Sequence, residues 1–343
     1  MTEDSIANDQ NKKQDLFNPQ RWGLPQIAIA GLADRLRSIW SRFRGCFTTR
    51  THDTSEYAFV YMRGLLTMDM NRNYANIARR VICIGDDGQN IQHFMSDSPW
   101  LASSVFTQIQ SEICQHPELA GGMLTLDESG DERSGPFSAG SARQMIGRLG
   151  KVDMGQVGVA LGYYQYGIWA MVDARLYLPE GWFDQEHSEL RQRLHIPEET
   201  TFATKIQLGL NMIKLANGIP FEVVGCDTTY GRDSEFREAL DNEGMLYMGD
   251  IPKNLHVYTK EPILGIPADT PGKRGRPHSR LVVTNGVQPV EVSALTDEKV
   301  LMPITIRHSE RGLLIYKCAG CRVWTTTETV SYTHLRAHET VLD

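Results

Sequence analysis

The sequence lacks the features that mark membrane and secreted proteins. Its 343 residues contain no uninterrupted apolar run of the roughly 18 residues that a membrane helix needs. The first twenty residues are polar and of mixed charge, which excludes a secretory signal. Six cysteines are scattered without the spacing of a disulfide framework, so a reducing cytoplasm is the expected location. We find no internal repeat.

An excess of positive charge is also missing. Lys and Arg number 35 against 42 for Asp and Glu, which gives a formal net charge of −7. The chain as a whole therefore has no basic footprint for nucleic acid, although local basic clusters stay open. At about 150 residues per domain, the length allows about two domains and a sizeable core. The composition thus predicts a globular protein of about two domains.

The first 118 residues divide into a lead-in and a helical region. Residues 1–52 begin as a disordered segment and turn helical over about 24–43, with six arginines and a single acid between residues 20 and 50. Residues 53–118 show several short helical patterns joined by tight turns, and the second of these helices is predicted over Tyr74–Val81. This pattern is typical of a helix-turn-helix-like DNA-binding module, but short helices also cap ordinary cores. Pattern alone leaves both interpretations open.

Residues 119–251 alternate between strand and helix patterns. GMLTLDESG is a short apolar strand that ends in acids, and residues 155–165 and 168–178 form two strands around the tight turn Tyr166-Gly167. Helical patterns follow, and then the buried strand PFEVVGCD, a capped helix and the strand MLYMGDI. This order suits an RNase H-like core, though not that fold alone. We therefore predict an α/β fold: an RNase H-like core preceded by a helical N-terminal region.

The helical signal ends near residue 252. Residues 252–329 contain short β-like runs separated by Pro- and Gly-rich connections, which predict a β-rich insertion or second lobe after the core. Residues 330–343 (VSYTHLRAHETVLD) read like translated sequencing-adaptor sequence. We expect them to be an artificial tail that takes no part in the fold.

Two aspartates follow apolar strands, and their placement points to metal chemistry. Asp127 ends the strand LTLD, and Asp227 ends the strand VVGCD. An acid just beyond a buried strand costs desolvation free energy unless something pairs with it. Two such acids at neighbouring strand ends could share divalent metal, since Mg²⁺ takes a few carboxylates with waters and phosphate oxygens. The alternative is that each aspartate only forms a turn or caps a helix.

Three blocks of sequence carry a resemblance to a known family. They are YMRGLLT with NYANIARR and IQHFMSDSPW, then LDESG with GSARQMIGRLGKVDMGQVGVALGYY, and finally GCDTTYGRDSEFREAL. Over about residues 55–328 the chain resembles insertion-sequence transposases of the DDE superfamily, in the branch with a β-strand insertion. The resemblance implies that Asp127 and Asp227 are the first two catalytic metal ligands, with Mg²⁺ or Mn²⁺ as the cofactor. Two such ions, about 3.5–4 Å apart, would promote in-line attack on a phosphodiester.

The family pattern also has a third acid, usually a Glu on a helix after the β insertion. Here the chain runs through RVWTTTE directly into the expected tail, with no helix of that kind. Glu310 and Glu328 lie in the β-rich part, and neither is a good candidate. The resemblance therefore implies a fragment without its third catalytic acid, which cleaves transposon-end DNA poorly or not at all.

Local basic segments supply candidate DNA contacts. Residues 271–280 (PGKRGRPHSR) contain RGRP, which resembles the core of an AT-hook, an element that lies in a narrow A·T minor groove. A solvated linker is the alternative for this loop, and a surface turn is the alternative for the segment GRLGK. The candidate DNA contacts are Lys273, Arg274, Arg276 and Arg280 in the loop, and Arg148 and Lys151 in GRLGK.

Three functions follow from these features. The first is a transposase, which hydrolyses transposon ends and then directs the freed 3′-hydroxyl against target DNA. The second is a folded, catalytically dead DNA-binding remnant, and the third is an RNase H-like nuclease without strand transfer. The helical region and GRLGKVDMGQVGV favour the transposase family, whereas the missing Glu favours the remnant for this polypeptide. The expected partners are double-stranded DNA (transposon ends and target) and no membrane, with a homodimer left open. The expected location is the cytoplasm, in association with the nucleoid.

Overall fold

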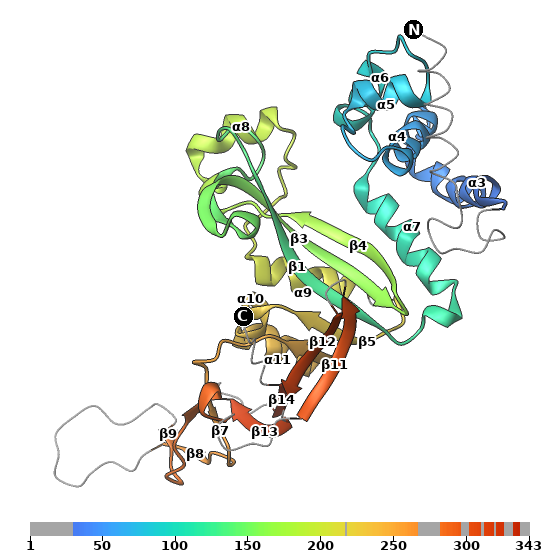
Figure 1. Cartoon of the computed structure of the whole chain (residues 1–343). Coiled ribbons are helices and arrows are strands. Elements are labelled where there is room, and N and C mark those ends of the chain that lie inside the picture. The colour runs from blue at the N-terminus through green and yellow to red at the C-terminus, as the bar shows by residue number, and fades with distance from the viewer. Residues whose placement is uncertain are drawn as a thin grey trace. The chain divides into compact units, whose positions relative to one another are not determined.

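The computed structural model describes residues 30–216, 218–266, 282–295, 302–309, 312–318, 320–325 and 332–336. The chain divides into two units, Met1–Glu112 and Ile113–Asp343 (Figure 1). The predicted division into five segments has no direct counterpart in this two-unit split, and its inner boundaries stay predictions.

Helices make up the first unit, as the sequence predicts for residues 53–118. The helix expected over 24–43 is described only in its second half, which is α3. The second helix has the predicted bounds, Tyr74–Val81. The elements are α3 (Leu32–Phe43), the 3-10 turn η2 (Arg44–Phe47), α4 (Ser55–Thr67), α5 (Tyr74–Val81), α6 (Gln89–Ser96) and α7 (Ala102–Cys114), which continues into the second unit.

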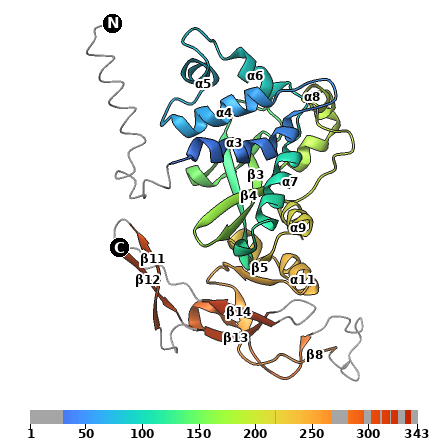
Figure 2. The same ribbon diagram turned by 90° about the vertical axis from the view of Figure 1, so that its right-hand side faces the viewer.

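Capping and close packing explain why these short helices form. The Asn73 side chain accepts a hydrogen bond of 2.8 Å from the Asn76 amide, which caps α5. Gly64 on α4 lies so close to Ile77 that a Cβ there would overlap the Ile77 side chain. As a result α4, α5 and α6 contact one another in a three-helix module around the buried Ile77 and Ile91 (Figure 2). The module is compatible with the helix-turn-helix-like prediction, and DNA binding by it stays a prediction.

A six-stranded mixed sheet organises the second unit (Figure 1). The strand β1 pairs antiparallel with β3 on one side and parallel with β5 on the other, and β6 extends the parallel part. Both β2 and β4 pair with β3. The strands are β1 (Gly122–Glu132), β2 (Ala142–Ile146), β3 (Lys151–Gln165), β4 (Ile168–Leu176), β5 (Phe221–Cys226) and β6 (Leu246–Gly249).

The turn between β3 and β4 has the predicted position. Tyr166 and Gly167 have positive φ values of 48° and 83°, as two-residue hairpin turns require. The strand β2 was not predicted, because it follows a Gly- and Ser-rich loop. It forms because the first part of β3 offers it a partner, with Ala142 opposite Gly155.

Helices cover one face of this sheet. The helix α9 packs against β3 and β4, and α11 packs against α9 and β6, with both helices beside β5 in Figure 2. Leu124, Leu126 and Leu161 are buried on that side. The opposite face exposes large apolar side chains, among them Trp169 (58% exposed) and Leu246 (71%). The helices of this part are α8 (Ser188–Arg193), α9 (Lys205–Leu215), α10 (Thr228–Gly231) and α11 (Ser234–Asn242), with 3-10 turns at Pro117–Leu119, Gly147–Leu149, Glu180–Phe183 and Gln185–His187.

Beyond residue 251 the described segments are β-rich, as predicted. Val257, Val292 and Val323 form a small buried cluster there. The expected artificial tail nevertheless supplies a strand, because residues 332–336 pair antiparallel with β13. The elements are β7 (His256–Tyr258), β8 (Leu264–Gly265), β9 (Val282–Val283), β10 (Val290–Glu291), the 3-10 turn η7 (Val292–Leu295), β11 (Met302–Ser309), β12 (Gly312–Cys318), β13 (Gly320–Thr325) and β14 (Tyr332–Arg336).

Candidate active site

Asp127 lies in the middle of β1. The expectation that it ends its strand is wrong, because the long β3 continues alongside as far as the pair Glu132–Gly155. Within the ladder, Asp127 pairs with Ala160. Side chains alternate along a strand, so the exposed Asp127 points away from the face that buries Leu124 and Leu126. Asp127 therefore stands on the sheet face opposite α9.

Asp227 follows directly after β5 and caps α10. One carboxylate oxygen, Oδ1, accepts a hydrogen bond of 3.0 Å from the Thr229 amide. The other, Oδ2, accepts a hydrogen bond of 3.2 Å from the Thr229 hydroxyl. Asp227 thus caps a helix, as the alternative interpretation expects. This cap leaves the metal hypothesis open, because a carboxylate has about four lone-pair sites and two of them are used here.

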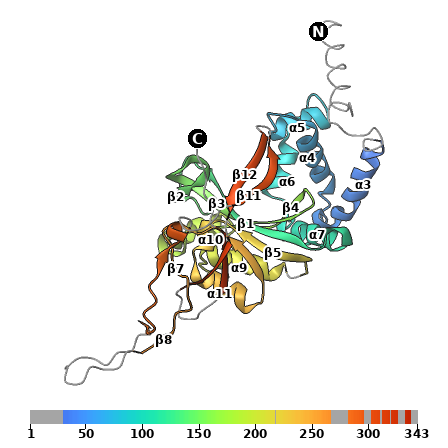
Figure 3. The same ribbon diagram turned by 60° about the horizontal axis from the view of Figure 1, so that its bottom comes forward.

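The strand register brings the two aspartates to adjacent positions. In the parallel pair of β1 and β5, shown side by side in Figure 3, Leu126 lies opposite Cys226. The next residue on each chain is Asp127 and Asp227, on strands whose usual spacing is about 4.8 Å. Cys226 also lies opposite Gly249 of β6, so Asp250 continues the same row. The sequence analysis did not single out Asp250, although this residue lies in the predicted strand MLYMGDI.

Close backbone packing holds the single turn of α10. Arg237 of α11, itself buried, donates a hydrogen bond of 2.8 Å to the Gly231 carbonyl. A Cβ on Gly231 would lie 3.0 Å from the carbonyl carbons of Gly249 and Asp250, and closer still to the Asp250 carbonyl oxygen. The Tyr230 ring packs against Phe236 with centroids 5.5 Å apart. These contacts fix the turn that begins at Asp227.

Two polar side chains, Glu128 and Tyr230, lie near the two aspartates on the helix side of the sheet. Glu128 points to the face of Leu126, and its Oε2 pairs with Lys205, the first residue of α9. Burial raises the pKa of the Tyr230 hydroxyl well above its usual range, and the charges of Glu128, Asp227 and Asp127 add to the shift. Burial, together with the charges of Asp227 and Asp250, raises the pKa of Cys226 to about 12.

The donor set fits one hard divalent cation. Asp127 and Asp227 offer carboxylate oxygens, and Mg²⁺ is commonly held by one or two carboxylates together with waters and phosphate oxygens. Within the described ranges, no group of three or more His, Cys, Asp or Glu side chains lies close enough to hold a metal ion. Glu310 and Glu328 lie outside those ranges. A second ion would thus need ligands beyond this pair.

Comparison with known proteins identifies the family. Residues 42–312 match the family model described as DDE superfamily endonuclease. The chain belongs to this family. It is also 28% identical over 203 residues to the "Probable transposase for insertion sequence element IS701" of Microchaete diplosiphon. That match covers 58% of this chain and 50% of the relative, so the chain spans about half the length of the curated relative.

Membership of the DDE endonuclease family confirms the resemblance seen in the sequence and the predicted α/β fold class. The description of the family names an endonuclease, and DDE endonucleases generally use divalent metal. In the described part of the chain, none of the helices is long and apolar enough to cross a membrane. The individual site residues stay predictions.

The predicted DNA contacts of this family member fall into two groups. Arg148 is exposed and pairs with Asp131 at 3.3 Å and Glu132 at 3.1 Å. Lys151 is exposed and pairs with Asp153 at 2.7 Å, which raises the pKa of Lys151. Exposed pairs of this kind are weak, so a phosphate can compete for either cation. The remaining contacts lie outside the described residues: Lys273, Arg274, Arg276 and Arg280.

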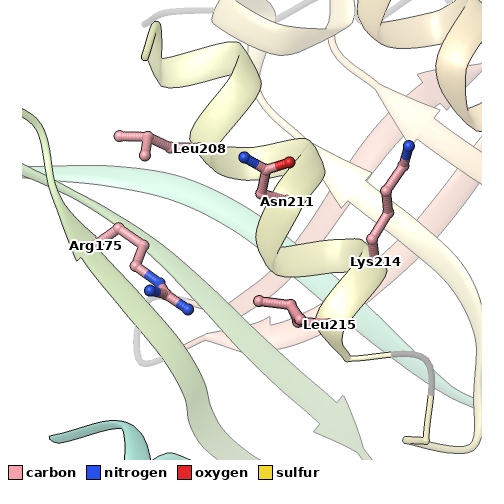
Figure 4. Close-up of a pocket in the computed structure, with 5 residues that line it drawn as sticks. All are labelled: Arg175, Leu208, Asn211, Lys214 and Leu215. Atoms are coloured by element: carbon pink, nitrogen blue, oxygen red, sulfur yellow. The ribbon is translucent and has the colours of Figure 1, made fainter. Parts of the chain in front are cut away.

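An open pocket of about 380 Å³ lies away from the aspartates, on the face that α9 covers. Figure 4 shows Arg175 of β4 facing the side chains of α9 across it. Both of its cations are already paired, Arg175 with Asp173 at 3.0 Å and Lys214 with Glu243 at 3.8 Å. None of the residues that line the pocket is an acid, so it offers no second set of carboxylates. Its lining residues are Arg175, Leu208, Asn211, Lys214 and Leu215.

Proposed function

We propose that this chain is a DNA transposase of insertion-sequence type, in which Asp127 and Asp227 together hold Mg²⁺ or Mn²⁺. One observation carries the proposal: the parallel register of β1 and β5 sets Leu126 opposite Cys226, so the two aspartates come next on adjacent strands. Asp127 lies on the sheet face that α9 leaves uncovered, and Asp227 begins the turn that follows the neighbouring strand. Membership of the DDE endonuclease family supports the same assignment.

The residues of the site would bind the metal ion and orient its carboxylate ligands. The two hydrogen bonds from Thr229 fix the rotamer of Asp227 before any ligand arrives, and the flanking strands β3 and β5 hold Asp127. A bound ion would supply Lewis-acid polarisation of the phosphodiester and a more acidic bound water. With two protein carboxylates for one ion, we expect this polypeptide to cleave DNA weakly.

The partners and location belong to the same proposal. The substrate is double-stranded DNA, first the transposon ends and then the target, and the chain would work at the nucleoid, with dimer formation as a further expectation. Arg148 and Lys151 lie in and beside the turn that joins β2 to β3, the strand that pairs with β1. Phosphate contacts there would hold DNA near the end of the strand that carries Asp127 and would be salt-sensitive.

Metal binding tests the core of the proposal. Mn²⁺ titrated into the purified chain and followed by electron paramagnetic resonance should report a site that Asp127→Asn and Asp227→Asn each weaken strongly. Asp131→Asn is the matched control, because Asp131 lies on the same strand, is exposed and pairs with Arg133 at 2.8 Å. Equal affinity in all four proteins would refute the assignment of the pair.

A DNA assay separates the three functions. Linear DNA carrying candidate transposon ends, incubated with Mn²⁺ and a supercoiled target, should give strand-transfer products if the chain is a competent transposase. Nicks without joining indicate a nuclease of another kind. Metal binding and salt-sensitive duplex binding without nicks indicate the DNA-binding remnant. Brisk nicking that Asp127→Ala abolishes would show that a third ligand exists in the chain.

A further inference from the structure

Two buried polar atoms near the acid pair have no hydrogen-bond partner among the residues that the structure describes. They are the hydroxyl oxygen of Tyr230, a residue with no exposed surface, and Oε1 of Glu128. A buried polar group without a partner loses its hydrogen bonds to water without replacement, and such groups are rare in folded proteins. Two of them in one small region therefore call for a physical explanation.

Their places in the chain link each atom to one of the acids. Glu128 follows Asp127 directly on β1, and Tyr230 lies three residues after Asp227 in the turn that Asp227 caps. Packing brings the two elements together beneath α9. A Cβ on Gly209 of that helix would lie 3.3 Å from both Leu126 Cδ1 and Tyr230 Cε1. The Tyr230 ring is thus beside the strand that carries Glu128.

The two atoms are also complementary. Burial and three nearby carboxylates raise the pKa of Tyr230, so its hydroxyl stays protonated and can donate. Of those three carboxylates, Glu128 has a buried oxygen that lacks a partner, while its other oxygen is held by Lys205. One donor and one acceptor that do not bond directly can both be satisfied by a single bridging water.

We propose that Tyr230 is a positioning residue whose hydroxyl donates to a buried water, which in turn donates to Glu128 Oε1. This water-mediated link joins the turn that begins at Asp227 to the strand that carries Asp127, on the face of the sheet that α9 covers. It thereby fixes the distance between the two metal-binding carboxylates. The inference rests on the proposed function, since it assigns the spacing to a metal site. Partners behind metal ligands commonly change metal affinity about 10–100-fold when they are removed.

The first test is a high-resolution crystal structure of the full chain without metal. An ordered water within hydrogen-bond distance of both Tyr230 Oη and Glu128 Oε1 supports the proposal. A dry contact between the two side chains, or another partner for the Tyr230 hydroxyl, would overturn it. This readout is independent of metal binding and of activity.

The second test is Mn²⁺ affinity. Tyr230→Phe keeps the packed ring and removes only the hydroxyl, so we expect a folded chain with about 10-fold or greater loss of affinity. Glu128→Met removes the acceptor from the other end, and the double variant should lose no more than the weaker-binding single variant. Tyr247→Phe is the matched control: Tyr247 lies on β6, and burial with Asp241 raises its pKa to about 12. It should bind Mn²⁺ like the wild type.

The outcomes separate this inference from the proposed function. If Asp227→Asn loses Mn²⁺ and Tyr230→Phe does not, the metal site stands and the positioning role is refuted. Additive losses in the double variant would also refute the water-mediated link. If Asp127→Asn and Asp227→Asn both bind Mn²⁺ like the wild type, the proposed function fails, and the crystal structure alone decides whether Tyr230 and Glu128 share a water.

Discussion

Gly231 offers the sharpest test of how the fold places Asp227. The residue closes α10, the single turn that Asp227 caps, and it packs against the backbone at the end of β6. In Gly231→Ala, the new Cβ would lie 3.0 Å from the carbonyl carbons of Gly249 and Asp250 and closer to the Asp250 oxygen. Backbone atoms cannot move aside like the end of a flexible side chain, so the turn and the strand must separate.

The cost follows from the size of that separation. Nonbonded carbon atoms rest at about 3.5–4.0 Å, so the two backbones must move apart by roughly 1 Å. Overpacking of this kind typically costs about 1–3 kcal/mol of unfolding free energy. In a unit of this size, each kcal/mol lowers the melting temperature by about 2–4 °C. The shift also displaces Asp227, so Mn²⁺ affinity should fall as well.

Denaturant unfolding followed by circular dichroism measures the first effect. Gly147→Ala is the control, since a Cβ on Gly147 meets no atom within 4 Å, and we expect a change of no more than about 0.5 kcal/mol. If both variants unfold at the same denaturant concentration, α10 does not pack closely against the backbone at the end of β6. Unchanged Mn²⁺ affinity in a destabilised Gly231→Ala would show that Asp227 is held by other contacts.

Other predictions concern charges. Hydrogen bonds from Ser55 and the Arg44 guanidinium lower the pKa of Asp53 to about 2. The ionised Asp53 therefore stabilises the fold fully above about pH 4, and this stabilisation is lost as the pH falls through 2. Asp53→Asn should flatten that part of an acid-unfolding profile. Lys205→Met leaves the carboxylate of Glu128 unpaired and should cost about 3 kcal/mol in chemical unfolding, much of which a second change, Glu128→Met, restores. Arg274→Ala with Arg276→Ala should weaken binding to A·T-rich duplex more than to G·C-rich duplex in an anisotropy titration, whereas equal losses would leave only a basic linker.

The sequence predicts local features of the fold well, because apolar periodicity and turn chemistry are local. Tyr74–Val81 has the predicted bounds, and the Tyr166–Gly167 hairpin turn has the predicted position. The end of β1 was misplaced because its second half reads ESGDE, with no apolar residue to mark a strand. That half is a strand only because β3, which comes later in the sequence, pairs along its whole length.

In the candidate site too, some features can be predicted from local sequence and others depend on the pairing of distant strands. Each aspartate could be chosen from an apolar run followed by an acid, but their adjacency depends on which strands pair, and the sequence does not encode strand order locally. The same holds for Asp250, whose row is set by the pairing of β5 with β6. The ion pair of Glu128 with Lys205 joins residues from a strand and a helix far apart in the chain. No spacing rule could have found it.

Capping and metal binding are compatible roles for Asp227, and one pair of variants separates them. The cap needs a side-chain oxygen that accepts from the Thr229 amide, and Asn serves there as well as Asp. A metal site needs the negative charge. Asp227→Asn should therefore keep the unfolding free energy nearly unchanged while Mn²⁺ affinity falls, whereas Asp227→Ala should lose both, with a stability cost of about 1 kcal/mol. Equal destabilisation by the two substitutions would contradict the cap. Full Mn²⁺ affinity in Asp227→Asn would mean that the carboxylate serves the helix alone.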